Sequence, residues 1–157
     1  EPIILGPAKR IMSLRDGSSK MSKSDPADAS RINLMDDSDI ISKKIKKAKT
    51  DQYPIPETLD ELKNRHEAIN LINIYASFAG VKVEDVLCKF SGNGFAIFKN
   101  ALSELVISKV SPITKEMNYL LNNKDEIVKI LQVGSEKAKK IASEVLADIK
   151  KIIGINF

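Results

Sequence analysis

Hydrophobic residues recur at helical spacing through most of the chain. Between residues 67 and 79, apolar side chains return every three or four positions, and Gly80 follows where a left-handed residue would end a helix. Similar stripes predict helices over 39–50, 83–90 and 95–110, with Ser38 as the N-cap of the first. The pattern therefore predicts a mainly α-helical protein.

Two places in the last third of the chain predict breaks between helices. Pro112 lacks a backbone N–H, so it marks a kink or a new helix start. Asn123 has the spacing from Glu126 to cap a short helix, and Ser135 is placed to begin a long one that ends at Gly154. The stripe of that last helix is wide and includes Ile141, Val145 and Ile149 among other residues.

Residues 1–36 have a different pattern, with three of the six prolines and little helical periodicity. Residues 9–17 predict a short strand that ends in an Asp16–Gly17 turn, and residues 29–37 predict an extended segment. A strand needs neighbours for its backbone groups, so we expect its partners upstream of residue 1. We therefore interpret residues 1–36 as the tail of a sheet-containing domain and residues 37–157 as a helical domain.

Composition narrows the class of protein. The 157 residues are 43% hydrophobic and 29% charged, with a net charge of +4, which suits a folded domain and permits an anionic partner. The single cysteine, Cys88, excludes an internal disulfide and suits a reducing compartment, so we expect a cytoplasmic protein. Because Cys88 lies beside Leu87 and Phe90 on a predicted short helix, we expect its side chain in the core. No apolar run approaches the roughly 20 residues that cross a bilayer, so we expect no membrane.

The stretch "GSSKMSKSDP" contains the clearest candidate chemistry. Lys20 and Lys23 are three residues apart among serines, in a segment that has little to contribute to a core. Two mobile ammonium groups with nearby hydroxyls and free backbone amides suit a polyphosphate. The alternative is a solvated surface loop that binds nothing, because Lys/Ser strings are common in loops.

The string K-M-S-K-S resembles the signature loop of class I aminoacyl-tRNA synthetases. Longer strings resemble the bacterial type of tryptophanyl-tRNA synthetase: "RIMSLRDGSSKMSKSDP", "IISKKIKKAKTD", "NLINIYASFAG", "GNGFAIFK" and "GSEKAKKIASEVL". The resemblance runs from about Arg10 to the C-terminus. It departs at Arg65–His66–Glu67, where the family commonly has a Lys-Pro-Gly or Arg-Pro-Glu step, which puts the local turn in question.

The resemblance implies an enzyme that activates L-tryptophan with ATP and transfers it to tRNA(Trp). Residues 1–36 would be the C-terminal edge of a Rossmann-type catalytic domain, and residues 37–157 an α-helical anticodon-binding domain. The wide apolar face of the last helix predicts that this helix packs back on the catalytic domain. The "HIGH"-like motif and the tryptophan pocket would precede residue 1. We therefore expect a homodimer for the full-length enzyme and no activity from this chain alone.

The resemblance also assigns roles in the loop. Lys20 and Lys23 would be catalytic, because negative charge grows on the leaving pyrophosphate and ammonium groups stabilise it. The ATP-binding set would comprise these two lysines together with Ile11, Met21, Ser22 and Ser24. Mg²⁺ would arrive with ATP, and no protein metal site is expected, since the only histidine, His66, has no cysteine near it in the sequence.

A lysine-rich stretch is the second candidate site, comprising Lys43, Lys44, Lys46 and Lys47. Such a cluster suits the backbone phosphates of tRNA. The alternative is a solvated helix face balanced by Asp36, Asp37 and Asp39. Two rival functions follow from the sequence: a helical RNA-binding module without nucleotide chemistry, and the tyrosyl relative of the same synthetase class.

Overall fold

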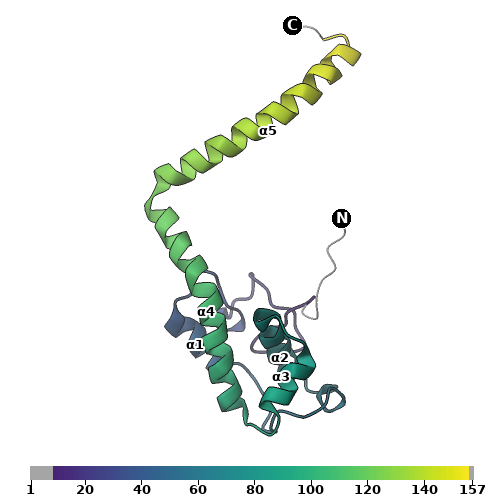
Figure 1. Ribbon diagram of the computed structural model, residues 1–157, viewed down its shortest axis with the longest axis vertical. Coiled ribbons are helices and arrows are strands. Elements are labelled where there is room, and N and C mark those ends of the chain that lie inside the picture. Colours follow the sequence, from purple (N-terminus) through teal and green to yellow (C-terminus); the bar gives the residue numbers. More distant parts are fainter. Residues whose placement is uncertain (1–8, 156–157) are drawn as a thin grey trace. The chain divides into compact units, whose positions relative to one another are not determined.

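The structure is a computed structural model, and it describes residues 9–155. The described part contains five α-helices and two short 3-10 helices and no strand, so the mainly α class is confirmed (Figure 1). The α-helices are α1 (Ser38–Lys46), α2 (His66–Ala79), α3 (Val83–Phe90), α4 (Phe95–Asn122) and α5 (Lys124–Ile152), and the 3-10 helices are η1 (Asp28–Ser30) and η2 (Asp60–Leu62).

The chain divides into two compact units. The first runs up to Lys115 and the second begins at Glu116. The boundary falls within α4, well after the expected domain boundary at residue 36. Residues that precede α1 contribute to the first unit, since Leu14 is 2% exposed and belongs to its hydrophobic core.

An aromatic cluster forms the centre of the first unit. The ring of Tyr75 on α2 lies 5.2 Å from that of Phe90 on α3 and 5.6 Å from that of Phe98 on α4, and Phe95 completes the group. The Tyr75–Phe90 and Phe95–Phe98 pairs are edge-on and the Tyr75–Phe98 pair is tilted, and aromatic contacts of these kinds add to the free energy of burying the rings. The predicted helix packing is confirmed for these four rings, whereas Phe78 is 37% exposed.

Helix α2 agrees closely with its prediction, and α1 differs at both ends. Gly80 ends α2 with φ of +69°, the left-handed conformation expected there. At α1 the N-cap is Asp37 in place of Ser38, because the Asp37 carboxylate accepts the Ile40 N–H at 2.7 Å. A carboxylate also suits the positive end of the helix dipole.

Of the predicted boundaries near the C-terminus, the helix start at Asn123 is confirmed, because Asn123 is the N-cap residue of α5, whereas a new helix start at Pro112 and the start at Ser135 are wrong. Helix α4 continues through Pro112, and α5 continues through the expected start at Ser135. Side chains on both sides of Pro112 are anchored to the first unit, since Val110 is buried and the Thr114 hydroxyl donates to the Leu34 carbonyl at 2.7 Å. Such tertiary contacts outweigh the hydrogen bond that proline removes.

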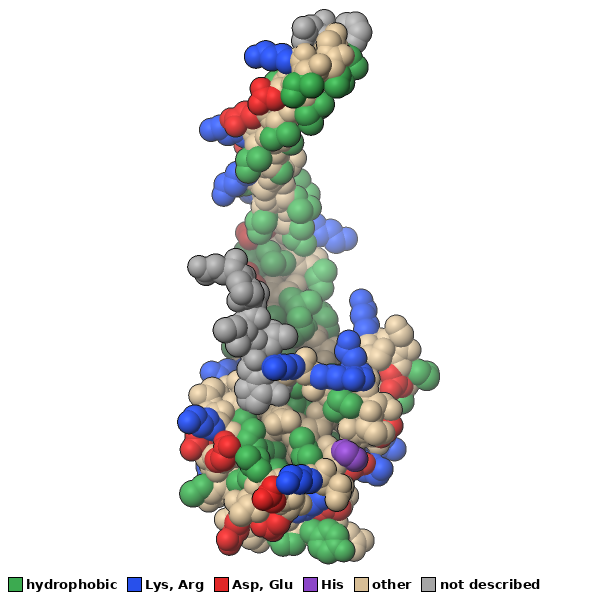
Figure 2. Space-filling view, turned by 90° about the vertical axis from the view of Figure 1, so that its right-hand side faces the viewer, with side chains coloured by type: hydrophobic (Ala, Val, Ile, Leu, Met, Phe, Trp, Pro, Cys, Tyr) green, Lys and Arg blue, Asp and Glu red, His purple; other side chains and the backbone are tan. Residues whose placement is uncertain are grey.

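Helix α5 is amphipathic, and none of its described residues is buried. Figure 2 shows hydrophobic side chains along one side of this helix and charged side chains gathered on another. Ile141, Val145 and Leu146 are each more than half exposed. Cys88, expected in the core, is also exposed, on α3, so that prediction is wrong.

Candidate functional site

The lysine loop, residues 17–24, comprises part of the turn and the second arm of a short hairpin together with the three residues that follow it. Met12 and Lys20 form an isolated antiparallel bridge in place of the predicted strand. Two backbone bonds flank the bridge: the Met21 N–H donates to the Ile11 carbonyl at 3.0 Å, and the Ser13 N–H donates to the Ser19 carbonyl at 2.8 Å. The pairing holds Ile11 opposite Met21, so two members of the expected ATP-binding set lie side by side.

The cationic and hydroxyl side chains of the loop are accessible. Lys20, Ser22, Lys23 and Ser24 are exposed, whereas Met21 is half-buried. Neither Lys20 nor Lys23 forms an ion pair with any residue in the described part of the chain. The Ser22 side chain accepts the Ser24 N–H at 3.2 Å, which orders the residues that follow the second arm of the hairpin. The loop thus presents two ammonium groups that are available to an anionic ligand.

Asp16 shapes the turn that enters the loop. Its carboxylate accepts the hydroxyls of Ser18 and Ser19 and the Ser18 N–H. These hydrogen bonds, the one from the Ser18 hydroxyl first, lower the pKa of Asp16 to about 2. The Asp16–Gly17 turn was predicted from the sequence, but the role of Ser18 and Ser19 in closing it was not. The signal was available, because Asp followed by Gly and Ser is typical of a side-chain-capped turn.

An ion cluster centred on the buried Lys44 fixes the segment that follows the loop. Lys44 of α1 is 7% exposed and donates to Asp36 and contacts Asp28, both at 2.7 Å. Although burial disfavours its charge, the hydrogen bonds that Lys44 donates to Asp28 and Asp36 raise the pKa of Lys44. The Lys44 hydrogen bond in turn lowers the pKa of Asp28. Arg31 closes the cluster by donating to the Asp25 carbonyl at 2.8 Å.

The lysine-rich stretch is therefore divided by the fold. Lys43, Lys46 and Lys47 are exposed and form no ion pair with described residues, and their spacing of three and four positions along α1 and its C-cap places them on one face, so they make up one basic surface. Lys44 points into the ion cluster, and we correct its place in the expected tRNA-binding set for that reason. The sequence signal for this difference was the helical stripe itself, because Lys44 lies next to Ile41 and Ile45 on the inner face of α1.

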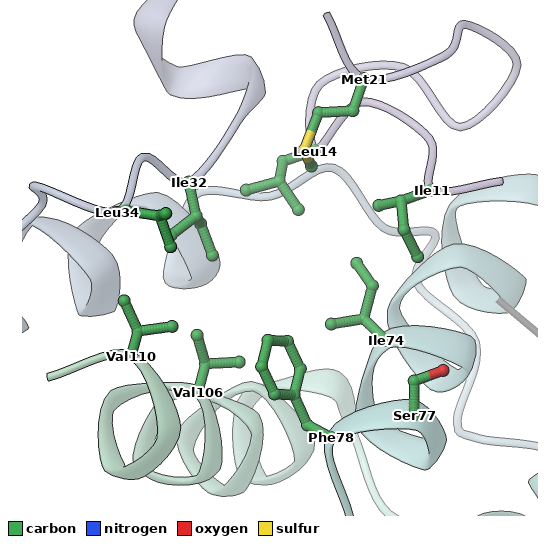
Figure 3. A pocket seen from close by; sticks show the side chains of 10 residues that line it. All are labelled: Ile11, Leu14, Met21, Ile32, Leu34, Ile74, Ser77, Phe78, Val106 and Val110. Atoms are coloured by element: carbon green, nitrogen blue, oxygen red, sulfur yellow. The ribbon is translucent and has the colours of Figure 1, made fainter. Parts of the chain in front are cut away.

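An apolar hollow of about 440 Å³ lies beside the hairpin (Figure 3). The hairpin contributes Ile11, Leu14 and Met21 to its wall, and helices α2 and α4 contribute Ile74 and Val106. Ile32, Leu34, Ser77, Phe78 and Val110 complete the lining. Since nearly all of these side chains are apolar, the hollow offers hydrophobic contact and few polar groups to orient a ligand.

Residues 2–111 match the family model of class I tRNA synthetases for W and Y. The chain belongs to this family. Sequence relatives include the tryptophan–tRNA ligase of Rhizobium meliloti, 53% identical over 98% of this chain, and that of Caulobacter vibrioides, 49% identical over 98% of it. The chain spans only 44% and 45% of the length of those two relatives.

Solved structures of the family have a similar fold. Tryptophanyl-tRNA synthetase from Mycoplasma pneumoniae aligns with a TM-score of 0.71 at 26% identity, over 94% of this chain and 46% of the other. The enzyme from Campylobacter jejuni, solved with ADP and tryptophan, aligns with a TM-score of 0.65 over 92% of this chain and 43% of the other. The resemblance noted in the sequence is thereby confirmed for nearly the whole chain.

Within residues 9–155, no group of three or more His, Cys, Asp or Glu is placed to hold a metal ion, and His66 begins α2. No helix in the same residues is both long and apolar enough to cross a membrane.

Proposed function

We propose that the full-length protein that contains this chain is a tryptophan–tRNA ligase. It would activate L-tryptophan with ATP in the cytoplasm and transfer it to tRNA(Trp), acting as a homodimer. Residues 1–36 would be the edge of a Rossmann-type catalytic domain, and the helices after them would form an anticodon-binding domain. The tryptophan pocket and the "HIGH"-like motif would lie in the part of the protein outside this chain.

The single observation that carries the proposal is the exposed state of Lys20 and Lys23, neither of which pairs with a described acidic residue, at an anchored hairpin in a chain about 50% identical to tryptophan–tRNA ligases. A free ammonium group can move onto a phosphate without breaking an ion pair. The anchored stem limits where these groups can go, which reduces the entropy lost when they close on a ligand.

The first chemical step is adenylate formation. A tryptophan carboxylate oxygen bonds to the α-phosphorus of ATP, while the bond from that phosphorus to the oxygen bridging the β-phosphate breaks. No general base is required, because the carboxylate is already ionised at neutral pH. Negative charge concentrates on the departing pyrophosphate, where Lys20 and Lys23 stabilise it more in the transition state than in the ground state.

The remaining loop residues hold ATP in place. Ser22 and Ser24 would donate hydroxyl hydrogen bonds to phosphate oxygens, and the backbone around Met21 would complete the site. Ile11, paired with Met21 in the hairpin stem, would contact the adenine. Mg²⁺ would enter bound to ATP and neutralise part of its charge, and no residue of this chain is assigned to it.

The second step transfers the acyl group to the 3′-terminal ribose hydroxyl of tRNA, and AMP leaves. We propose that Lys43, Lys46 and Lys47 contact the tRNA backbone, since they form one exposed basic surface. The uncovered apolar side of α5 supports the proposal that this helix packs against the catalytic domain.

Tryptophan-dependent exchange of pyrophosphate into ATP tests the proposal. The full-length protein should catalyse exchange with tryptophan and not with tyrosine, and the 157-residue chain alone should catalyse none. Exchange with tyrosine would identify the tyrosyl relative instead. Tight RNA binding by the full-length protein without any exchange would favour the alternative, a helical RNA-binding module.

A further inference from the structure

Asn70 on α2 binds the backbone of the hairpin stem on the side that faces away from the lysine strand. Its Oδ1 accepts the Met12 N–H at 2.9 Å, and its Nδ2 donates to the Met12 carbonyl at 2.8 Å and more weakly to the Ser13 carbonyl at 3.4 Å. The side chain is 3% exposed. One buried amide therefore satisfies both backbone groups of Met12.

The alternation of an antiparallel pair explains why Met12 needs this partner. The Ile11 carbonyl and the Ser13 N–H point toward the lysine strand, where they bond Met21 and Ser19. The N–H and carbonyl of the residue between them point the opposite way. In a wider sheet a second strand would pair with these two groups, and here Asn70 takes its place.

Asparagine is suited to this task because its amide carries a donor and an acceptor spaced like those of a peptide group. Aspartate would keep the bond from the Met12 N–H but could donate to neither carbonyl. A buried carbonyl facing a carboxylate would be left without its hydrogen bond and repelled by the charge. The contact is therefore specific to the amide.

A second contact places the other side of the loop entrance against the same helix. The backbone at Gly17 approaches the first turn of α2 so closely that a Cβ atom would lie 2.6 Å from the Glu67 nitrogen. The stem and the turn of the hairpin are thus both seated on α2. Movement of α2 would carry the lysine loop with it.

We propose that Asn70 is a positioning residue for the lysine loop: it holds the register in which Lys20 lies opposite Met12 and Ile11 opposite Met21. The inference rests on the proposed function for its consequence in catalysis, whereas the hairpin register can be tested without it. Asn70 would not touch ATP itself. Its effect on adenylate formation would arise through the placement of Ile11, Lys20 and Lys23.

The test uses Asn70→Asp in the full-length protein, with Asn73→Asp as the matched control. Asn73 lies on the same helix, is half-buried, and forms no side-chain hydrogen bond with described residues. Asn70→Ser is made alongside, because its smaller side chain leaves room for water and adds no charge. Circular dichroism checks that each variant is folded.

The first measurement is amide hydrogen exchange at Met12 and Met21. The Met21 amide should exchange about tenfold or more faster in both Asn70 variants, and the Met12 amide should do so in Asn70→Ser, which loses the acceptor of its N–H, while amides in the middle of α4 should be unchanged. The second measurement is single-turnover adenylate formation. The rate should fall about tenfold to a hundredfold with the KM for tryptophan unchanged, because a small misplacement of reacting groups costs that much.

A double variant separates positioning from a general structural role. Lys23→Ala should reduce the rate much less in the Asn70→Asp background than in the wild type, because a misplaced lysine already contributes less to the rate of adenylate formation. Faster exchange at Met21 with an unchanged rate would overturn the proposal, and so would unchanged exchange. If both Asn70 variants fail to fold, Asn70 is a residue of general stability and the proposal is wrong. If the wild type forms no tryptophanyl-adenylate while the exchange result holds, the proposed function fails and the hairpin register stands.

Discussion

The two compact units of the chain differ in where their hydrophobic residues lie: they are buried in a core in the first unit and exposed along α5 in the second. In the unit that ends at Lys115, Phe98, Leu102 and Val106 are almost completely buried along a single face of α4. In the unit that begins at Glu116, α5 has an equally regular apolar stripe and no buried residue. Regular spacing therefore predicts an amphipathic helix in both cases, but only the first unit contains the surface that covers it.

The largest expected effect comes from a matched pair of leucines. Leu102→Ala should lower the free energy of unfolding of this chain by about 2–5 kcal/mol, because it removes a fully buried side chain and leaves a cavity. Leu146→Ala, on the exposed stripe of α5, should change it by less than about 0.5 kcal/mol. Urea unfolding measures both.

The same pair can sharpen the comparison in the full-length protein. If α5 packs against the catalytic domain, Leu146→Ala should there cost clearly more than it does in this chain. An equal and negligible cost in both proteins would contradict the proposed packing of α5.

The next largest effect concerns the ion cluster centred on Lys44 in the first unit. Lys44→Met should lower the free energy of unfolding by about 3 kcal/mol, because it leaves the 8% exposed Asp36 without a cationic partner. Lys43→Met, one position earlier and exposed, should be close to neutral. Combining Lys44→Met with Asp36→Leu should recover much of the loss, and a double variant as unstable as Lys44→Met would contradict this account.

These lysines also show how far the sequence could predict the site. The identity of the loop and the extents of α2 and α3 follow from local signals such as Gly80 and the K-M-S-K-S string. The burial of Lys44 depends on Asp28 and Asp36, which reach it only after the chain has folded back. The Asn70 contact likewise joins residues 58 positions apart, and no periodic pattern marks such a contact.

The errors in secondary structure have a similar origin. The residues of the predicted strand pair with only one backbone bridge and with the side chain of Asn70, so they form a hairpin stem and no regular strand. Gly134 and Ser135 remain helical because strong helix formers flank them, and the cost of one glycine is only about 1 kcal/mol. The helix propensity of the surrounding residues was sufficient for α5 to continue through Ser135, although a serine at this position is also typical of a helix start.

An intermediate effect on the free energy of unfolding is expected for Asp51 and Arg65, an ion pair that joins the two ends of the segment between α1 and α2. Arg65 donates to both carboxylate oxygens of Asp51, at 2.7 and 2.8 Å, and lowers its pKa. Because the folded-state pKa is depressed, this stabilisation is present above the unfolded pKa of about 4 and is lost as the pH falls through the folded value. Asp51→Asn should cost about 1–2 kcal/mol at pH 7.

The pH dependence of unfolding checks this assignment. The difference between wild type and Asp51→Asn should shrink as the pH falls below about 4, since the wild-type carboxyl then becomes neutral as well. Asp60→Asn, at an 83% exposed carboxylate, is the control and should change little. A difference that stays constant down to pH 2 would mean that the charge of Asp51 is irrelevant to stability.

The smallest effect compares the basic residues of the two units. Replacing Lys46 and Lys47 with alanine in the full-length protein should weaken tRNA(Trp) binding severalfold and reduce its salt dependence by about one unit of slope for each lost phosphate contact. Lys139→Ala with Lys140→Ala on α5 is the matched pair and should change neither. Filter binding over a range of salt concentrations measures both, and equal effects of the two pairs would place the tRNA contact elsewhere.

Single-turnover adenylate formation at saturating ATP tests most directly whether Lys23 acts on the departing pyrophosphate, as we propose. Lys23→Ala in the full-length protein should slow this step by roughly two orders of magnitude, equivalent to about 3 kcal/mol, with tryptophan binding unchanged. Lys23→Arg should recover only part of the rate, because a planar guanidinium does not replace a compact ammonium group. Lys63→Ala, at a lysine whose side chain is 73% exposed, should have no effect. A Lys23→Ala enzyme with a normal single-turnover rate and only a raised KM for ATP would contradict the claim, because Lys23 would then bind the ground state and the transition state equally.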